Sequence, residues 1–480
     1  MTDLSDKYEV IIGLETHIQL NTRTKIFCSC KADSWDDEAN TNICPVCSGL
    51  PGVLPVLNKA VVEKAVLLSQ AMGADIPPVS YFDRKNYFYP DLPKGFQITQ
   101  YDLSVGMGGG VDIPMEEGFR HVRIHKLHVE EDAGKTKNEA NRRLIDFNRC
   151  GVPLIEMVTE PDLRSAEEAA QYVIRLRQLI RWLGISEGDM EKGHLRADAN
   201  VSIRLKGEQK LNPKTEIKNL NTIDGMRTAI HAEVERQIAQ MEAGGRIEQW
   251  TLSWDEQKGE LKKMRSKETE ADYRYFREPD LLPVVMDDTW KAQILANYPE
   301  LPLQRRARFL TEYGLSAYDA DVLTSERPLS DYFENAVKAY GAEPKKMANW
   351  VMNDVLRIMN EQGAGVEQLK ITPQTLAELQ QLLDAKKING TVAKKVLELM
   401  AVRGDSPAKI VEAEGLAAVS DEGAIRELCE KIVTENPQEV ENYKAKPTLM
   451  GWFVGQVMRA SRGKADANTA QAILKELLEQ

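Results

Sequence analysis

The sequence predicts an α+β protein in which a large antiparallel-sheet domain precedes two regions of helices. Up to about residue 290, short segments of alternating apolar and polar residues are separated by Gly, Pro, Asn and Asp, as in antiparallel strands. Four prolines between 279 and 302 then mark a boundary. Beyond it, apolar residues recur at helical spacing almost to the end of the chain.

Length and composition set the number of domains. A chain of 480 residues is longer than one hydrophobic core usually supports, and 42% hydrophobic with 28% charged residues is ordinary for a globular protein. The changes in pattern predict domains at 1–294, 295–404 and 405–480. The last boundary follows the break at 403–407, which contains Gly, Ser and Pro.

No run approaches the roughly 18 apolar residues of a membrane span, and the first residues lack the basic region of a secretory signal. We therefore expect a cytoplasmic protein without membrane contact. The formal net charge is −12, so any electrostatic binding of nucleic acid must be local. One basic patch without acidic residues occurs between 443 and 464, and its members are Lys444, Lys446, Arg459, Arg462 and Lys464.

The first predicted strand, 9–20, has an apolar face and a polar face. Glu15 and His17 share the polar face, because side chains two residues apart on a strand point the same way. Such a pair can converge on one metal ion. Taken alone, an E-x-H pattern is more often a surface pair than a ligand set.

Four of the six cysteines form a metal-type pattern. Cys28 and Cys30 are separated from Cys44 and Cys47 by thirteen residues, a spacing that predicts a closed four-thiolate zinc site with a structural role. Reduced thiols at two strand ends are the alternative. Cys150 and Cys429 have no neighbouring cysteine and are expected to be buried as small apolar residues.

Three central segments offer carboxylates beside basic or amide groups: 128–135, 145–156 and 215–221. This mixture can hold Mg²⁺ and neutralise a phosphoryl group in transfer. Glu130 and Glu131 are adjacent, and adjacent residues of a regular strand point to opposite faces. Either a bulge turns one of them or only one is a ligand.

A helix is well specified after the second of these segments, with Ser165 and Glu168 as a capping box, apolar residues at helical spacing and Gly184 beyond its end. We expect it to cover the apolar side of the sheet. The strand 194–205 that follows alternates strictly and places Asp198 and Arg204 on one polar face. A solvated strand face is the alternative interpretation of that segment.

These stretches resemble the B subunit of the glutamine-dependent aspartyl/glutamyl-tRNA amidotransferase over essentially the whole length. The matching motifs include G-L-E-T-H-I-Q-L at 13–20, H-V-E-E-D-A-G-K at 128–135, L-R-A-D-A-N-V-S-I-R at 195–204 and G-W-F-V-G-Q-V-M-R-A-S-R-G-K at 451–464. The resemblance implies a catalytic cradle related to the glutamine synthetase fold, followed by a helical domain and a small tail domain that bind tRNA.

By this resemblance, the cradle phosphorylates the side-chain carboxylate of misacylated Glu-tRNA(Gln) or Asp-tRNA(Asn) with ATP and Mg²⁺, and ammonia then displaces phosphate. An amidase A subunit would supply the ammonia from glutamine, and a small C subunit would complete a heterotrimer. The sequence contains neither a P-loop nor the paired serines of an amidase, which agrees with this division of labour.

The resemblance also implies roles for single residues. Those implied as the Mg²⁺ cluster are Glu15, His17, Glu130, Glu131 and Glu156. Those implied as further catalytic or substrate contacts are Lys85, Tyr87, Asp198, Arg204 and Lys218. The chain departs from the family pattern at Leu252, Leu261, Arg277 and Leu282. A non-catalytic tRNA-binding adaptor that retains the fold, or a free-standing amide ligase, are the alternative functions.

Overall fold

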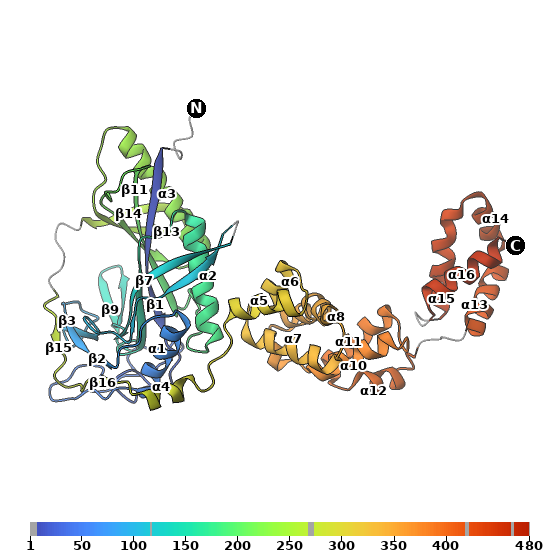
Figure 1. Ribbon diagram of the computed structural model, residues 1–480, viewed down its shortest axis with the longest axis horizontal. Coiled ribbons are helices and arrows are strands. Elements are labelled where there is room, and N and C mark those ends of the chain that lie inside the picture. The colour runs from blue at the N-terminus through green and yellow to red at the C-terminus, as the bar shows by residue number, and fades with distance from the viewer. Residues whose placement is uncertain (1–6, 116–117, 267–272, 418–421, 462–464, 480) are drawn as a thin grey trace. The chain divides into compact units, whose positions relative to one another are not determined.

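The computed structural model describes residues 7–115, 118–266, 273–417, 422–461 and 465–479. It divides the chain into two compact units, Met1–Leu301 and Pro302–Gln480, which are coloured blue to olive and yellow to red in Figure 1. The first unit combines a large sheet with helices, and the second is helical. The α+β class predicted from the sequence is confirmed.

The first unit is built on a sheet that contains nine strands among the described residues, in the order β14-β13-β12-β11-β1-β10-β7-β5, with β6 paired to β7. The strands are β1 (Tyr8–Gln19), β5 (Gly106–Met107), β6 (Gly110–Pro114), β7 (Phe119–Glu131), β10 (Pro153–Thr159), β11 (Leu195–Leu205), β12 (Thr215–Leu220), β13 (Trp250–Asp255) and β14 (Glu260–Ser266). The first strand of the chain thus lies in the middle of the sheet.

The prediction of a purely antiparallel sheet is wrong at one pair. β12 and β13 run parallel, with Lys218 opposite Ser253, while every other pair of this sheet is antiparallel. The reason is the helix α3 (Ile223–Glu242), which connects the two strands. Parallel neighbours require a long crossover of this kind, whereas antiparallel neighbours can be joined by a short turn. The sheet is therefore mixed.

Apolar side chains from β1 and β11 fill the core on one face of the sheet. Ile12, Leu14 and Ile18 are fully buried and belong to the same core as Tyr172 and Leu176 of α2 (Ala166–Trp182). The helix α1 (Lys59–Ala71) adds to this core. Because the core takes up this face, the polar residues of β1 and β11 must point to the other one.

The start of α2 is the one expected from the sequence. The Ser165 hydroxyl accepts a hydrogen bond from the backbone N–H of Glu168 at 3.1 Å. The Glu168 carboxylate accepts from the N–H of Arg164 at 2.7 Å, one residue earlier than a standard capping box. At the other end, Gly184 takes a φ of +65°, which a residue with a side chain adopts at a cost.

Smaller elements surround one end of the sheet. Three strands pair in the order β15-β3-β4, namely β3 (Asp83–Asn86), β4 (Phe96–Thr99) and β15 (Phe276–Arg277), while β2 (Val79–Ser80) pairs with β16 (Val284–Val285) and β8 (Lys135–Glu139) with β9 (Arg142–Asp146). The helix α4 (Asp288–Leu295) follows. Arg277, one of the departures from the family pattern, forms an ion pair with Asp83 at 2.9 Å and lies over the Tyr81 ring.

The described residues of the second unit form two apolar cores. The first runs from Phe309 to Leu416 and the second from Ile425 to Leu478. Because Ile410 and Val411 belong to the first core, that core extends past the boundary expected at 404. The helices are α5 (Pro302–Glu312), α6 (Ala317–Leu323), α7 (Arg327–Tyr340), α8 (Pro344–Trp350), α9 (Leu356–Gln362), α10 (Pro373–Asp384), α11 (Gly390–Arg403), α12 (Pro407–Ala413), α13 (Glu422–Glu435), α14 (Pro437–Ala445), α15 (Met450–Ala460) and α16 (Ala467–Leu478).

A buried carboxylate fixes α5 against α7. Glu334 accepts hydrogen bonds from Arg308 at 2.7 Å and from the Tyr313 hydroxyl at 2.8 Å, and it also pairs with Arg305. Burial opposes its charge, but these donors prevail and lower the pKa of Glu334 to about 2. The ionised carboxylate is therefore part of the native packing. Across the described part of the chain, no helix has the length and apolar character needed to cross a membrane.

Candidate catalytic site

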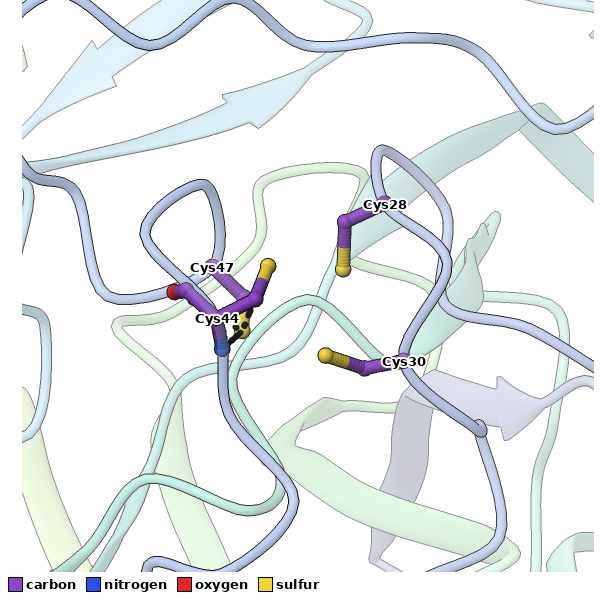
Figure 2. A group of neighbouring side chains, drawn as sticks. All are labelled: Cys28, Cys30, Cys44 and Cys47. Carbon is purple, nitrogen blue, oxygen red and sulfur yellow. Dashed lines mark hydrogen bonds between the residues drawn. The ribbon is translucent and has the colours of Figure 1, made fainter.

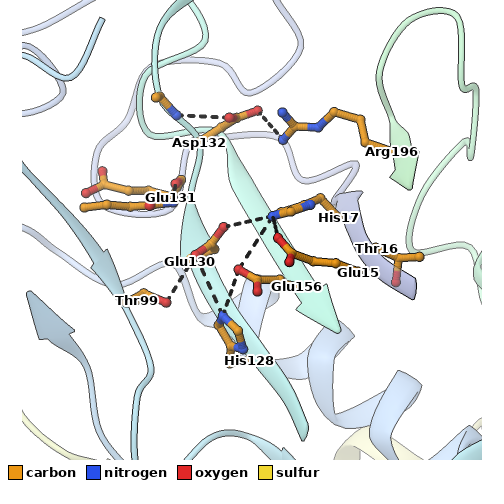
Figure 3. A network of polar contacts seen from close by, with 12 residues as sticks. Glu15, Thr16, His17, Thr99, His128, Glu130, Glu131, Asp132, Glu156 and Arg196 are labelled. Carbon is orange, nitrogen blue, oxygen red and sulfur yellow. Dashed lines mark hydrogen bonds and ion pairs between the residues drawn. The ribbon is translucent and has the colours of Figure 1, made fainter. Parts of the chain in front are cut away.

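The polar face of the sheet gathers acidic and imidazole side chains from three adjacent strands. His17 on β1 lies opposite Glu156 on β10, and Glu156 lies opposite His128 on β7. Glu15 and Glu130 project from the same face, two residues away from His17 and His128 respectively (Figure 3). The register of the sheet thus brings polar side chains from three strands that are far apart in sequence into one cluster.

The five side chains form two overlapping groups of potential metal ligands. His17 Nε2 lies 3.5 Å from Glu156 Oε2 and 3.8 Å from an oxygen of both Glu130 and Glu15. His128 Nε2 lies 3.2 Å from the same Glu156 oxygen. The potential ligand atoms of Glu15, His17 and Glu156 lie within 4.8 Å of one another, as do those of His128, Glu130 and Glu156. Glu156 is common to both groups.

The pKa values of the cluster are shifted because several carboxylates lie close together in a buried place. Burial raises the pKa of Glu130 and of Glu15, and the charge on Glu156 raises both further. Burial also disfavours the imidazolium of His17, but Glu156 and Glu130 outweigh it and raise the pKa of His17 to about 9. The cluster therefore holds protons that a divalent cation would displace.

The donor set is compatible with Mg²⁺. Three carboxylates provide the oxygen ligands that Mg²⁺ prefers, and the two imidazoles are ligands that Mn²⁺ and other transition metals also accept. The Nδ1 atom of His128 is buried and has no hydrogen-bond partner among the described residues. The other ring nitrogen, Nε2, faces Glu130 and Glu156, so Nε2 is the atom of His128 that could bind a metal ion.

Glu131 does not share this cluster, which corrects its inclusion among the implied Mg²⁺ ligands. Its carboxylate accepts a hydrogen bond from the backbone N–H of Ile98 at 2.9 Å and pairs with Lys94. It lines a cavity of about 280 Å³ together with Cys28 and Cys47. Adjacent residues of β7 point to opposite faces, so the alternative of a single ligand, Glu130, is the one that the geometry favours.

Two further basic residues border the cluster. Lys85 on β3 is half-buried, and Glu130 and Glu156 raise its pKa against the opposing effect of burial. Its ammonium lies 5.0 Å from the centre of the Tyr273 ring. Lys218 on β12 contacts Asp198 at 2.6 Å and Glu216 at 2.9 Å. Because Asp198 lies opposite Glu15, Lys218 borders the cluster from the β12 side.

Tyr87 lies beside Lys85 in a wall of tyrosines. Its hydroxyl donates to Gln97 at 3.0 Å, and its ring packs edge to face against Tyr89 and Tyr273. Burial raises the pKa of the Tyr87 hydroxyl, which keeps it neutral.

Arg204 lies far from the cluster, which corrects its implied catalytic role. It lies opposite Glu9, which is six residues or about 20 Å along β1 from Glu15. There it forms an ion pair with Glu9 at 2.6 Å, and Arg164 pairs with the same carboxylate at 2.9 Å. Its contacts hold β1, β11 and the segment before α2 together.

The sequence also left three residues of the site unassigned. His128 takes the position that Glu131 was expected to fill, and Arg196 and Asp132 form an ion pair of 3.0 Å beside His17. The signal for His128 was present, because H-x-E at 128–130 has the same spacing of two as E-x-H at 15–17. Asp132 carried no such signal, because it follows the end of β7.

The four predicted zinc cysteines also meet. Their sulfur atoms lie within 4.8 Å of one another, with Cys28 and Cys30 on one loop and Cys44 and Cys47 on the next (Figure 2). Cys47 Sγ accepts the backbone N–H of Cys44 at 3.2 Å. The neighbouring Cys28 thiol and this N–H lower the pKa of Cys47 to about 4 despite burial. Cys150 and Cys429 are buried, as predicted.

The predicted tail patch is only partly described. Lys446 and Arg459 are exposed. Lys444 lies within α14, and nothing is described of its side chain. Arg462 and Lys464 lie outside the described residues.

The polar face of the mixed sheet thus gathers carboxylates and imidazoles that could hold a metal ion, and such clusters with shifted pKa values are typical of enzyme sites. Comparison with known proteins gives the family. A family model described as the GatB/GatE catalytic domain matches residues 10–292, and a second, described as the GatB domain, matches residues 331–478.

Similar proteins cover the same length. A protein of Persephonella marina is 47% identical over 98% of this chain and 100% of its own. One of Pelodictyon phaeoclathratiforme is 48% identical with the same coverage, and one of Thermodesulfovibrio yellowstonii is 46% identical over 99% of this chain. Each is named as the B subunit of an aspartyl/glutamyl-tRNA(Asn/Gln) amidotransferase. The chain belongs to the family of these amidotransferase B subunits and is a component of an enzyme of the ligase type.

Proposed function

We propose that this chain is the subunit that activates and amidates the side-chain carboxylate of Glu-tRNA(Gln) or Asp-tRNA(Asn), with ATP as phosphoryl donor and ammonia as nucleophile. The observation that carries the proposal is the convergence of Glu15, Glu130 and Glu156 with His17 and His128 on the polar face of the sheet. The names of the relatives supply the tRNA substrates.

The reaction consists of two displacements. A carboxylate oxygen of the substrate attacks the γ-phosphorus of ATP, the bond to the β-phosphate oxygen breaks, and ADP leaves. Ammonia then attacks the carbonyl carbon of the acyl phosphate, inorganic phosphate leaves with the electrons of the C–O bond, and the nitrogen loses a proton. The products are the amide, ADP and phosphate.

Glu15, Glu130, Glu156, His17 and His128 are the residues that would hold Mg²⁺. Bound there, Mg²⁺ neutralises charge on the phosphate oxygens, which is most of the help that phosphoryl transfer needs.

The chain supplies two further cations. The Lys85 ammonium faces Glu130 and Glu156 and can neutralise the incoming carboxylate, while Lys218 is held by Asp198 and Glu216 where it can bind a phosphate. Tyr87 and Tyr273 enclose Lys85, which suits them to exclude water and to contact the aminoacyl end.

The partners belong to the same proposal. Ammonia would come from glutamine through an amidase A subunit, and a small C subunit would complete a cytoplasmic heterotrimer. The naming of the relatives as one lettered subunit of an amidotransferase and the missing amidase serines support this arrangement. We further propose that the sheet is related to the glutamine synthetase fold, that the domain 1–294 is the catalytic cradle, and that the helical domain and the tail domain bind tRNA. The expected division of these two at 404/405 is moved beyond Leu416, where the first helical core ends.

The decisive experiment follows ³²P from γ-labelled ATP in the assembled enzyme with Mg²⁺. Both misacylated tRNAs are tested, with ammonium replacing glutamine in parallel reactions. The expected result is a labelled aminoacyl phosphate that disappears as amide forms, and release of labelled phosphate only when misacylated tRNA is present. Tight tRNA binding without ATP turnover on either tRNA would refute the proposal and leave a tRNA-binding adaptor.

The tail patch gives a second prediction, on tRNA affinity. Neutralising Lys446 and Arg459 together, as K446Q/R459Q, should make the slope of log affinity against log salt shallower by about 1.4–1.8. The reason is that tRNA binding then neutralises two fewer phosphates and releases fewer counterions. Filter binding across a salt series measures this. The matched control is K431Q/K475Q, which removes two positive charges from exposed lysines on α13 and α16, helices that pack in the same C-terminal core. Equal slopes for the two variants would place the tRNA contact elsewhere.

We also propose that the four cysteines hold a structural Zn²⁺. Tetrahedral thiolate sites without an open position are typical of structural zinc, and the convergence of the four sulfur atoms fits such a site. Cys44→Ser is expected to reduce zinc from one ion per chain to nearly none and to expose the loop 28–47 to protease. Elemental analysis and limited proteolysis measure the two effects. Cys429→Ala, in the core of the second unit, serves as the control and should retain its zinc.

A further inference from the structure

Lys25 is a fully buried lysine beside the cysteine cluster. Its exposed fraction is 0%, which is exceptional because a lysine is almost never fully buried unless its charge is paired. Its Nζ donates to the backbone oxygen of Asn42 at 2.9 Å and lies 3.7 Å from Cys47 Sγ. No ion pair joins it to a carboxylate among the described residues. The charge of Lys25 is therefore directed at a thiol and a carbonyl.

The surroundings hold Lys25 firmly in this place. Its backbone N–H donates to the Cys30 oxygen at 2.8 Å, and the next N–H, of Ile26, donates to the Gly151 oxygen at 2.9 Å. A Cβ at Gly151 would lie 3.7 Å from Lys25 Cδ and 3.5 Å from Cys47 Cβ, which are ordinary van der Waals distances, so the backbone at 151 packs closely against both side chains.

The negative charge of a zinc site with four thiolates explains why a cation is needed beside Cys47. A zinc ion with four thiolates carries a net charge of −2, and a buried charge of this size is costly unless it is compensated. Cys47 receives two donors, the Cys44 N–H and the Lys25 ammonium. Charge-assisted donors to sulfur reduce the repulsion among the thiolates and orient the ligand, as groups surrounding a metal site commonly do.

We propose that Lys25 is the built-in counter-charge of the four-cysteine zinc site and the residue that positions Cys47 for metal binding. This inference rests on the proposed zinc site and goes beyond it. It assigns to one residue outside the ligand set a share of the zinc affinity. It also implies that the buried position of Lys25 depends on the presence of zinc at the four cysteines.

The first test compares zinc binding by Lys25→Met and Lys31→Met in the full chain. Lys25→Met keeps most of the side-chain length and removes the charge. Lys31→Met removes an exposed charge from the same loop, where Lys31 pairs with Asp37, and serves as the matched control. In competition with a chromophoric chelator, K25M is expected to lose 10–100-fold in zinc affinity, and K31M is expected to match the unmodified chain. Equal affinities for the two variants would overturn the inference.

A spectroscopic readout separates the charge from simple packing. With Co²⁺ in place of zinc, the thiolate-to-metal charge-transfer band should move to lower energy in K25M, because Cys47 loses a positive donor and its sulfur becomes more electron-rich. The K31M spectrum should be unchanged. A K25M band at the position seen in the unmodified chain would contradict the proposed contact with sulfur.

The unmodified chain gives an independent test if K25M does not fold. Amine acetylation followed by peptide mass spectrometry should leave Lys25 unlabelled in the zinc-loaded protein and label it after zinc is removed by a chelator. Equal labelling in both states would overturn the inference. A chain that binds neither zinc nor cobalt would refute the proposed zinc site itself, an outcome that differs from metal binding that is insensitive to Lys25.

Discussion

Replacing Glu156 by Gln is expected to lower turnover on the order of 10³-fold while the chain stays folded. Glu156 is the carboxylate common to both metal-type groups, and it faces His17 at 3.5 Å and His128 at 3.2 Å. The amide keeps the size of the side chain but removes the negative charge that both imidazoles and a divalent cation would share. Apparent Mg²⁺ affinity should fall together with turnover.

The measurement is Mg²⁺-dependent ADP formation in the presence of misacylated tRNA, with a thermal unfolding curve to check folding. Glu160→Gln is the matched control, because Glu160 follows β10 closely, is more than one-third exposed and pairs only loosely with His125 at 3.6 Å. It should change turnover less than about threefold. An E156Q enzyme as active as E160Q would exclude the cluster as the catalytic centre.

Replacing Glu334 by Gln is expected to destabilise the helical unit by about 3 kcal/mol. The substitution leaves Arg305 and Arg308 without the carboxylate that they share. For a unit of this size, the melting temperature should fall by about 6–12 °C. Hydrogen exchange of α7 in the full chain would localise the effect.

The same site gives a pH dependence with a definite sign. The pKa of Glu334 is lowered to about 2 from an ordinary value of 4.5, so its stabilisation is complete above about pH 4.5 and is lost as the pH falls through about 2. The difference in stability between the unmodified chain and E334Q should shrink across that window. Glu312→Gln is the control, since Glu312 is an exposed partner of Arg308 at 3.7 Å. A constant difference between pH 5 and pH 2 would contradict an ionised Glu334.

The features that the sequence predicts well are those set by neighbours in the chain. The spacing of two places Glu15 with His17, Ser165 starts α2, and the cysteine spacing brings four thiols together. Each depends on strand or helix geometry over a few residues or on a short loop. These parts of the fold and of the site could be predicted without knowledge of the tertiary structure.

The features that residue patterns alone do not predict, as distinct from the resemblance to a family, depend on pairing between distant strands. Glu156 meets both His17 and His128 only because β10 lies between β1 and β7 in one particular register, and a shift by one residue would turn its side chain into the core. The resemblance implied a catalytic role for Arg204, which shares a polar strand face with Asp198, but its distance along the strand places it beside Glu9. A shared face does not imply a shared site.

The central position of β1 has a consequence for how the protein is made. β1 leaves the ribosome long before its two partners β10 and β11, which begin at Pro153 and Leu195. At translation rates of 5–20 residues per second, both edges of β1 stay unpaired for roughly seven to thirty seconds, until β10 has emerged. An unpaired strand of this kind is a template for aggregation. We therefore expect the nascent chain to need chaperone protection until residue 205 has emerged, and the cluster of carboxylates and imidazoles to form only after Glu156 on β10 has emerged.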